Sequence, residues 1–183
     1  MFLLENKTKS SSFIEWILVI VVALILSFFI RTFILSSTQV VGSSMNDTLQ
    51  TNDRLFVNRI FFMVDNLDYG DIVEFHSPVE DKDYIKRVIG LPGDTVEISN
   101  QQVYLNGNLL TENYINTDTT SPITNQTSWQ LGEEEIFVMG DNRLPLGSRD
   151  SRDFGPIEKD SIVGIAFFRY YPLNEMKVMN EGI

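Results

Sequence analysis

Residues 84–94 read YIKRVIGLPGD and combine a strand-like run with turn residues. Between Tyr84 and Ile89, β-branched and aromatic side chains surround one lysine and one arginine, a composition typical of a β-strand. Pro92 and Gly93 follow and predict a tight turn. The sequence therefore predicts a strand at this point, ended by a turn that reverses the chain.

Further short strands are predicted on both sides of this block. Runs of β-branched and aromatic residues bounded by turn residues occur at 55–57, 71–75, 95–98, 136–138 and 162–170. Asn106-Gly107 lies between two apolar runs and predicts a hairpin, because this pair readily adopts the positive φ angles of a type I′ turn. The polar stretch from Thr111 to Gln130 is expected to be a long loop. The expected fold class is all-β, with a barrel-like antiparallel β domain over residues 36–183.

An apolar segment precedes this β-rich region. Residues 13–30 read FIEWILVIVVALILSFFI, and no charge occurs from Trp16 until Arg31. A membrane-spanning helix needs about 20 residues, which the run from Trp16 to Leu35 supplies if the Arg31 side chain reaches the lipid headgroups. The segment 13–35 is therefore expected to be a single transmembrane anchor.

The anchor has a competing interpretation as a cleavable signal peptide. The apolar run is longer than is usual for a signal peptide, and no A-x-A-like cleavage site follows it. Lys7 and Lys9 favour a cytoplasmic location for residues 1–12. Two nearby glutamates and Arg31 weaken this orientation when it is judged from charge alone.

The composition excludes several classes of function. The chain of 183 residues has no cysteine, which excludes disulfides, thiolate catalysis and cysteine-based zinc sites. It has a single histidine, His76, which argues against a histidine-based metal site. The formal net charge of −11 disfavours binding of DNA or RNA, because their phosphates would be repelled. We expect no metal, no cofactor and no nucleic-acid partner.

Ser44 is the first candidate for nucleophilic catalysis. It lies in the small-residue turn Gly42-Ser43-Ser44, shortly after the apolar segment. Gly42 permits unusual backbone angles and close approach of a ligand, and the N–H group of Ser44 could help to stabilise an oxyanion. A serine-rich turn is more commonly an ordinary loop, so this residue alone carries little weight.

A serine nucleophile needs a general base, and the chain offers His76 or a lysine. His76 precedes a Ser-Pro pair at the end of a predicted strand, where a solvated loop residue is expected. Lys86 and Arg87 are neighbours in a predicted strand. Because side chains alternate along a strand, they are expected to point to opposite faces of it. Only one of these two cations is expected to face the core.

Burial would make Lys86 a usable base. An apolar environment disfavours the charged form, and bringing the pKa of a lysine from about 10.4 to near 8 requires about 3 kcal/mol. The alternative is a lysine whose amine reaches solvent or a salt bridge. A third polar cluster, at Asp141-Asn142-Arg143 and 148–152, is either a loop held by Arg–Asp pairs or a group of residues that orients the base.

Together these three clusters resemble the type I signal peptidases, bacterial membrane-bound serine proteases with a serine–lysine dyad. The matching segments are, in chain order, 42–45 with 48–49, 69–73, 84–94, and 140–143 with 148–152. The resemblance covers nearly the whole chain, and the lysine block 84–94 matches without interruption. It implies an endopeptidase that removes signal peptides from exported preproteins.

The resemblance also implies a role for each matching residue. Ser44 corresponds to the nucleophile, Lys86 to the general base, and the N–H group of Ser44 to part of the oxyanion hole. Some relatives add a serine hydroxyl as a second donor at the position of Gly42, so here that donor must be a backbone group or is absent. Ser148 corresponds to the serine that orients the lysine. The remaining matches are the support residues Arg87, Asp141, Asp150 and Arg152, and the lining of shallow pockets for small substrate side chains, Val40, Met45, Leu49, Tyr84 and Ile85.

Two departures from the family pattern bear on these roles. Asp47 stands where the family usually has a proline, which would stiffen the turn. Four residues, Leu144 to Gly147, precede Ser148, where the family usually has two. The insertion bears on the assignment of Ser148, and Ser151 is the alternative if the loop shifts its register.

The implied topology places the peptidase domain, residues 36–183, outside the cytoplasm, and the expected partners are preproteins with signal peptides, membrane lipid and the secretion translocon. Residues 32–43 span at most about 40 Å even when fully extended, so the active site is expected near the membrane surface. Phe61-Phe62-Met63 either touches lipid or belongs to the core.

Three other functions remain open at this point. A non-catalytic relative with the same fold would be expected to lack Ser44 or Lys86. A self-cleaving repressor-type protease shares the dyad but would be expected to carry a DNA-binding domain and no anchor. A membrane-anchored β-rich binding module would depend on neither residue.

Overall fold

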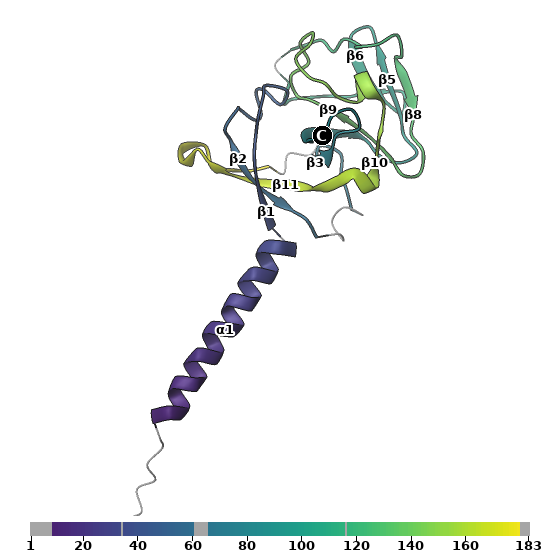
Figure 1. Ribbon diagram of the computed structural model, residues 1–183. Coiled ribbons are helices and arrows are strands. Elements are labelled where there is room, and N and C mark those ends of the chain that lie inside the picture. Colours follow the sequence, from purple (N-terminus) through teal and green to yellow (C-terminus); the bar gives the residue numbers. More distant parts are fainter. Residues whose placement is uncertain (1–8, 34, 61–65, 116, 180–183) are drawn as a thin grey trace, which may run out of the picture.

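The computed structural model describes residues 9–33, 35–60, 66–115 and 117–179. One long helix, α1 (Lys9–Phe33), projects from a β-rich region that holds the rest of the described chain (Figure 1). The other elements are, in chain order, β1 (Leu35–Gln39), β2 (Arg54–Asn58), β3 (Ile72–His76), β4 (Asp83–Gly90), β5 (Thr95–Ser99), β6 (Gln102–Leu105), β7 (Asn108–Leu109), β8 (Ser128–Gln130), β9 (Glu135–Met139), α3 (Ser151–Phe154), β10 (Ile157–Glu158), η1 (Lys159–Ser161), β11 (Ile162–Tyr171), η2 (Leu173–Glu175) and β12 (Lys177–Val178).

Two antiparallel sheets form the β-rich region. The larger sheet has eight strands in the order β1-β2-β11-β3-β4-β9-β10, with β12 paired to β11, and the smaller sheet has the order β7-β6-β5-β8. The all-β prediction is therefore confirmed as two antiparallel sheets. Among the described residues no strand pairing joins β1 to β10, so the larger sheet does not close into a barrel, and this part of the prediction is corrected.

Strand β4 runs through the middle of this architecture, as the stretch 84–94 predicts. Ile85 packs against an apolar cluster built from β2, β3, β11, the turn after β1 and Met179, whereas Val88 and Ile89 belong to two further clusters. Because neighbouring side chains of a strand point to opposite faces, these clusters cover both faces of β4. Its second half is fully buried, and it therefore holds polar side chains away from water on either face.

The turn between β6 and β7 follows the sequence prediction. Asn106 and Gly107 have φ angles of 51° and 78° and connect the two strands as a tight hairpin. The polar stretch 111–130 is largely loop, but it ends in β8, which pairs with β5. The sequence did not reveal β8, because Trp129 is the only large apolar residue in this three-residue strand; its ring packs 4.7 Å from that of Phe137.

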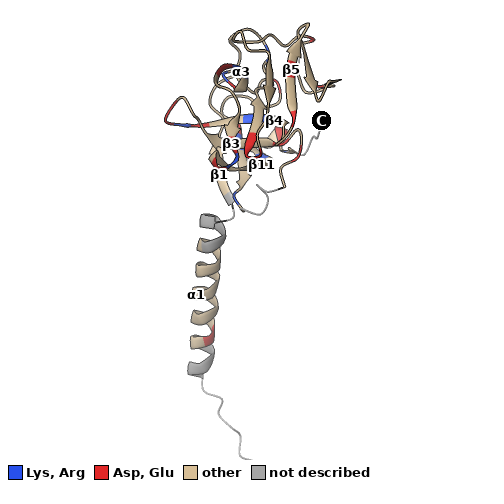
Figure 2. Ribbon diagram, turned by 90° about the vertical axis from the view of Figure 1, so that its right-hand side faces the viewer, with Lys and Arg blue, Asp and Glu red and all other residues tan. Residues whose placement is uncertain are grey.

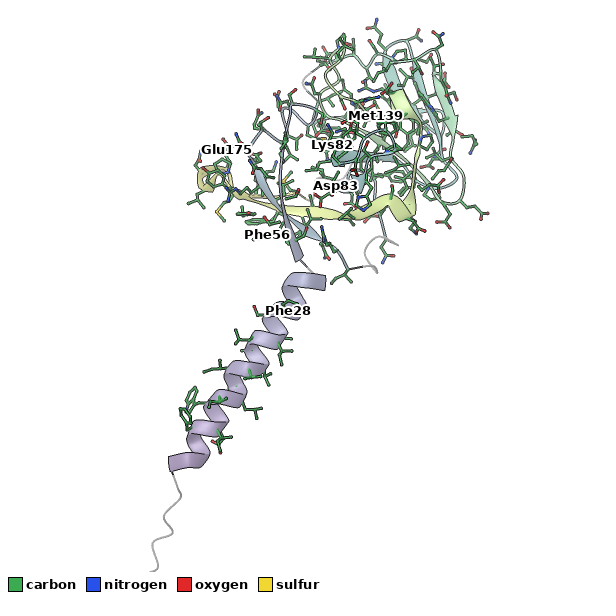
Figure 3. All side chains as sticks on the ribbon, in the orientation of Figure 1. Phe28, Phe56, Lys82, Asp83, Met139 and Glu175 are labelled. Atoms are coloured by element: carbon green, nitrogen blue, oxygen red, sulfur yellow. The ribbon has the colours of Figure 1, made fainter. Side chains whose placement is uncertain are left out.

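Helix α1 exposes its side chains from Phe13 to Phe28, and Glu15 is the only charged residue among them (Figures 2 and 3). Within the part of the chain that the structure describes, no helix has both the length and the apolar character needed to cross a membrane. The side chain of Arg31 and the run Phe61-Phe62-Met63 lie outside the described residues.

Candidate active site

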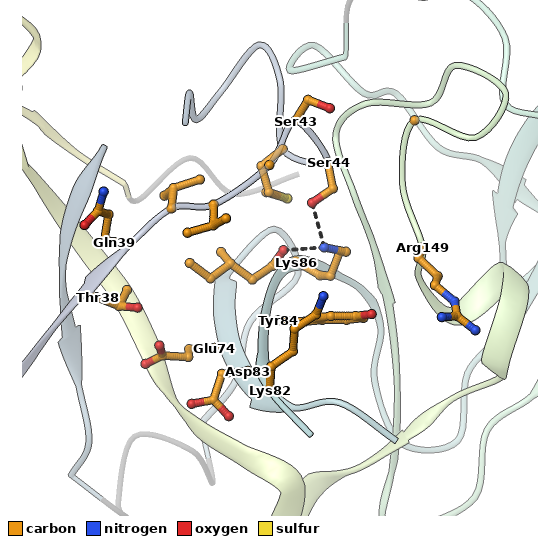
Figure 4. Close-up of a pocket in the computed structure, with 16 residues that line it drawn as sticks. Thr38, Gln39, Ser43, Ser44, Glu74, Lys82, Asp83, Tyr84, Lys86 and Arg149 are labelled. Carbon is orange, nitrogen blue, oxygen red and sulfur yellow. Dashed lines mark hydrogen bonds between the residues drawn. The ribbon is translucent and has the colours of Figure 1, made fainter. Parts of the chain in front are cut away.

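Ser44 and Lys86 lie within hydrogen-bonding distance of each other, although they are 42 residues apart in the chain. Lys86 Nζ donates to Ser44 Oγ at 2.8 Å and to the carbonyl oxygen of Ile85 at 2.8 Å (Figure 4). Ser44 stands in the turn that follows β1, and Lys86 belongs to β4. The arrangement pairs a hydroxyl with an amine that could take its proton.

The environment of Lys86 suits a general base. The residue is 3% exposed, and burial lowers the pKa of its amine to about 8, although the charges of Asp150 and Asp141 act in the opposite direction. The Tyr84 ring centroid lies 5.1 Å from Nζ and forms part of this cover. A useful fraction of Lys86 is therefore neutral near physiological pH, as a base must be.

The rate of peptide-bond cleavage is expected to rise with pH and to level off above about pH 8. Only the neutral amine accepts a proton, so kcat/KM falls about tenfold for each pH unit below that value. The measurement is kcat/KM from about pH 6 to about pH 10, with a peptide that has no titrating group in this range. A profile that is flat below pH 8 would contradict Lys86 as the base.

The backbone around Ser44 is arranged to receive a negative charge. Gly42 has a φ angle of 98°, and its open side has no atom within 4 Å of an ideal Cβ position. Among the described residues, the N–H group of Ser44 donates to no acceptor. A free N–H group beside the Ser44 hydroxyl is an arrangement that can stabilise a tetrahedral oxyanion.

The segment after β9 holds the Ser44 turn in place. Asn142 donates from its backbone N–H to the Ser44 carbonyl at 3.1 Å and from Nδ2 to the Ser43 carbonyl at 3.0 Å. Gly140 comes so close that a Cβ there would collide with the Ser44 carbonyl oxygen and with the Ser148 hydroxyl. Gly140 and Asn142 thus fix the position of the Ser44 backbone relative to Lys86.

Gly140→Ala is expected to lower kcat/KM by roughly 100-fold, because the added Cβ pushes the Ser44 backbone away from its position beside Lys86. Gly132→Ala is the matched control: its nearest atom would be a Glu135 carboxylate oxygen at 3.5 Å, an ordinary contact. Both variants are compared with wild type by steady-state cleavage of one peptide. Equal activity of Gly140→Ala and wild type would show that this contact does not set the position of Ser44.

Two buried ion pairs support the site. Arg87 donates to Asp141 through Nε at 2.9 Å and through Nη2 at 2.7 Å, and its Nη1 reaches the Gly70 carbonyl at 2.8 Å. Arg152 binds both oxygens of Asp150 at 2.8 Å. The four support residues that the resemblance suggested therefore lie in two buried ion pairs, Arg87–Asp141 and Arg152–Asp150.

Arg87 and Lys86 are both buried, which corrects the expectation that only one of them faces the core. Apolar clusters cover both faces of β4, so neither cation can reach water simply by facing away from the core. Arg87 forms an ion pair with Asp141, whereas Lys86 lacks a paired carboxylate among the described residues, and burial lowers the pKa of its amine.

Asp150 holds the loop that carries this support. Burial raises the pKa of its carboxyl group, but the hydrogen bonds and charge of Arg152 outweigh burial, so the pKa is lowered. One carboxylate oxygen accepts the N–H of Gly140 at 3.0 Å, and the other caps the short helix α3 by accepting the N–H of Arg152. The carboxylate therefore connects α3 to the end of β9.

Ser148 is buried but does not contact Lys86 by a hydrogen bond. Its hydroxyl lies close enough to Asp150 to help lower the pKa of that carboxyl group, yet it makes no hydrogen bond of normal geometry with any described residue. Ser151 does not replace it, because its hydroxyl accepts the N–H of Val138 at 3.0 Å. Among the described residues, the two hydrogen bonds of Lys86 Nζ go to Ser44 and Ile85.

The inserted residues form an exposed turn beside the site. The N–H of Gly147 donates to the Leu144 carbonyl at 2.9 Å, and Leu146 at the tip is 98% exposed. Gly147 packs against the Asn142 amide, at a distance that leaves no room for a Cβ, and it also borders the cleft over Ser44. The insertion thus extends outward, with only its last residue at the active site.

A cleft of about 510 Å³ opens over Ser44 and Lys86 (Figure 4). Residues 38–45 form one wall and residues 82–86 the other, with Gly147 and Arg149 at one end. Four of the five residues expected to line substrate pockets border this cleft: Val40, Met45, Tyr84 and Ile85. Leu49 does not border it; its side chain is fully buried in the cluster beneath Met45.

The structure also places residues that sequence reasoning did not single out. Asn142 lies in the predicted polar cluster, but its sequence context gave no sign that it binds the Ser43 carbonyl. Glu112, in the polar stretch 111–130, pairs with Arg143. Glu74 lines the cleft from β3, where a charged residue between valine and phenylalanine was the available signal. His76, the alternative base, is largely exposed and bonds to Asp83 at 2.5 Å, and no hydrogen bond links it to Ser44.

Comparison with known proteins gives a consistent set of relatives. Residues 13–171 match the family described as "Signal peptidase, peptidase S26". The chain is 39% identical to signal peptidase I S of Bacillus subtilis (strain 168), over 96% of this chain and 98% of the relative. It is 38% identical to signal peptidase IB of Staphylococcus aureus (strain Mu50), over 90% and 92% of the two chains. A solved signal peptidase I from Enterococcus faecalis V583 is 33% identical and covers 54% of this chain and 95% of its own, with a TM-score of 0.46.

Proposed function

The chain belongs to the signal peptidases of peptidase family S26, and from this premise we propose that it cuts with Ser44 as the nucleophile and Lys86 as the general base. The activity itself follows from the family: the protein is a serine endopeptidase that removes signal peptides from preproteins. The observation that carries the proposed mechanism is the 2.8 Å contact between Lys86 Nζ and Ser44 Oγ in a buried site.

The first chemical step forms an acyl-enzyme. Neutral Lys86 accepts the hydroxyl proton while Ser44 Oγ attacks the carbonyl carbon of the scissile bond. The resulting oxyanion is stabilised by the N–H group of Ser44, and one such donor contributes roughly 3 kcal/mol. Lys86 then passes its proton to the leaving amine, and the mature protein departs.

The second step releases the signal peptide. Lys86 Nζ takes a proton from a water molecule, whose oxygen attacks the ester carbonyl on Ser44. Collapse of this second tetrahedral intermediate returns the proton to Ser44 Oγ. The burial that lowers the pKa of Lys86 supports both steps, because each begins with a neutral amine.

The substrate binds as an added strand between the two cleft walls. Strand β4 pairs with β3 through Asp83 to Arg87, but its pairing with β9 begins only at Arg87, so the Asp83–Lys86 edge facing the cleft is unpaired among the described residues. An extended peptide can pair with the backbone of this edge. Val40, Met45 and Ile85 then offer an apolar surface to small side chains before the cleaved bond.

Membrane attachment is part of the proposal. The segment 13–35 acts as a single-pass anchor with residues 1–12 in the cytoplasm, and residues 36–183 form the peptidase domain outside it. The support is the run of exposed apolar side chains from Phe13 to Phe28. Strand β1 follows α1 closely, which brings the cleft near the lipid surface, where preproteins leave the translocon.

The test is cleavage of a secretory preprotein by the full chain in liposomes, with the new N-terminus identified by mass spectrometry. Wild type is expected to cut at one site after the signal peptide, and Ser44→Ala is expected to be inactive. Ser43→Ala, which removes only the neighbouring hydroxyl, is expected to keep cutting. Cleavage by Ser44→Ala would overturn the assignment of the nucleophile.

A further inference from the structure

Glu74 is a buried carboxylate in the wall of the substrate cleft, and one of its oxygens has no partner among the described residues. It is 5% exposed, and its Oε2 makes no hydrogen bond with any described residue. The neighbouring carboxylates are paired: Asp83 bonds to His76 and Glu80 to Lys82. An ionisable group removed from water normally has a partner, because leaving one unsatisfied is costly.

The strand pairing explains why the two strands beside Glu74 offer no side-chain donor. Glu74 on β3 lies opposite Gly164 of β11 on one side and opposite Ile85 of β4 on the other. Gly164 has no side chain, and a Cβ there would collide with the Asn58 carbonyl, so this position cannot supply a donor. Ile85 is apolar. Neither lateral neighbour can therefore satisfy the carboxylate.

The open direction for Glu74 is the cleft. The residue borders it together with Thr38, Gln39 and Asp83, and Figure 4 shows its carboxylate between Thr38 and Asp83. Ile72, which shares its face of β3, belongs to the same apolar cluster as Val40 and Met45 beside Ser44. Glu74 thus places an acceptor beside the apolar cluster that continues toward the catalytic end, and the nearby Asp83 is already paired with His76.

We propose that Glu74 accepts a hydrogen bond from a hydroxyl-bearing side chain of the signal peptide, and so selects serine or threonine at one position before the cleaved bond. The inference rests on the proposed function, since it needs a peptide lying along the cleft. A hydroxyl suits the site because it supplies one donor, adds little volume and carries no second charge to desolvate.

The pleat of an extended peptide limits which substrate residue can contact Glu74. Side chains of an extended strand alternate between two sides, so every second residue faces the same wall. The residue just before the cleaved bond sits at Ser44 and faces the cluster that contains Val40 and Met45. Glu74 lies on the face of β3 and β4 that carries Ile72 and Ile85, which pack in this same cluster, and it is farther from Ser44 along the cleft, so the third or the fifth residue before the bond is the one that meets it.

The test compares matched peptides that carry valine or threonine, which have nearly the same shape, at each position from the second to the fifth before the bond. Wild type is expected to prefer threonine at the third or fifth position by at least about tenfold in kcat/KM, with no such preference at the second and fourth. Glu74→Met, which keeps the length but removes the acceptor, is expected to lose this preference. Asp83→Asn, which alters the paired carboxylate at the same end of the cleft, is expected to keep it.

Three results decide between the possible failures. A threonine preference that persists in Glu74→Met, or is absent from wild type, overturns the role of Glu74. A preference only at the second or fourth position overturns the geometry. Every enzyme is also given a reference peptide with alanine at all tested positions. If wild type cuts neither this peptide nor a preprotein, the proposed function fails, and the inference fails with it.

Discussion

Lys86→Met is expected to abolish cleavage, with a loss of at least about 10⁴-fold in kcat/KM. The substitution keeps the length of the side chain and removes only the amine that lies 2.8 Å from Ser44 Oγ. His76 cannot substitute, since it is exposed and bonded to Asp83. The measurement is single-turnover cleavage of a preprotein at pH 8, with Ser44→Ala as the reference for background.

The same variant is expected to be more stable than wild type, which separates lost chemistry from lost folding. The folded-state pKa of Lys86 is lowered from 10.5 to about 8, so below pH 8 the folded protein carries a charge that its surroundings disfavour. This shift corresponds to about 3 kcal/mol at neutral pH. The penalty fades as pH rises from about 8 to about 10.5, where the lysine becomes neutral in the unfolded chain as well.

Denaturant unfolding at pH 7 and at pH 10 tests this expectation. The gain of Lys86→Met over wild type should be large at pH 7 and small at pH 10. If Lys86→Met is much less stable than wild type at pH 7, misfolding would explain its loss of activity. That result would also contradict the conclusion that burial disfavours the charged form of Lys86.

Asp141→Asn is expected to destabilise the protein by about 3–5 kcal/mol. The change leaves the Arg87 guanidinium, which is fully buried, without its counter-charge, while nearly preserving the shape of the side chain. The measurement is the free energy of unfolding at pH 7. Activity should fall as well, because Asp141 adjoins Asn142, which holds the carbonyl groups of the Ser44 turn.

The matched control is an exposed pair of the same length. Arg149 Nε and Asp153 Oδ2 are also 2.7 Å apart, but about half of the Arg149 side chain is exposed. Asp153→Asn is expected to have little effect on stability, since water and salt screen such a pair. Equal effects of the two substitutions would show that burial does not decide the importance of the Arg87–Asp141 pair.

The sequence predicted much of the local structure, and it singled out Ser44 and Lys86, which the structure brings into contact. Strand periodicity and the Asn106-Gly107 turn depend on neighbouring residues, so they could be predicted directly. The pairing of Ser44 with Lys86 came from the resemblance, because no local rule joins residues this far apart. The larger sheet was expected to form a barrel, but closure depends on long-range pairing of edge strands that carry no local signal.

The surroundings of the dyad were harder to predict. Alternation along β4 assigned Arg87 and Lys86 to opposite faces correctly, but it could not show that both faces are covered. The partners that determine the environment, Asp141 for Arg87 and Glu112 for Arg143, lie in loops brought together only by the fold. Glu74 was overlooked for the same reason: its lack of a partner is a property of β11 and β4 as neighbours.

The most direct test of the central claim is chemical restoration of the amine at position 86. The chain has no cysteine, so Lys86→Cys introduces a single thiol that can be alkylated with 2-bromoethylamine in denaturant before refolding. Alkylation places an amine where Lys86 Nζ stood. The unmodified variant is expected to be inactive, and alkylation is expected to restore cleavage of the preprotein at the wild-type site. Activity of the unmodified cysteine variant, or no recovery in an alkylated and correctly refolded protein, would contradict Lys86 as the general base.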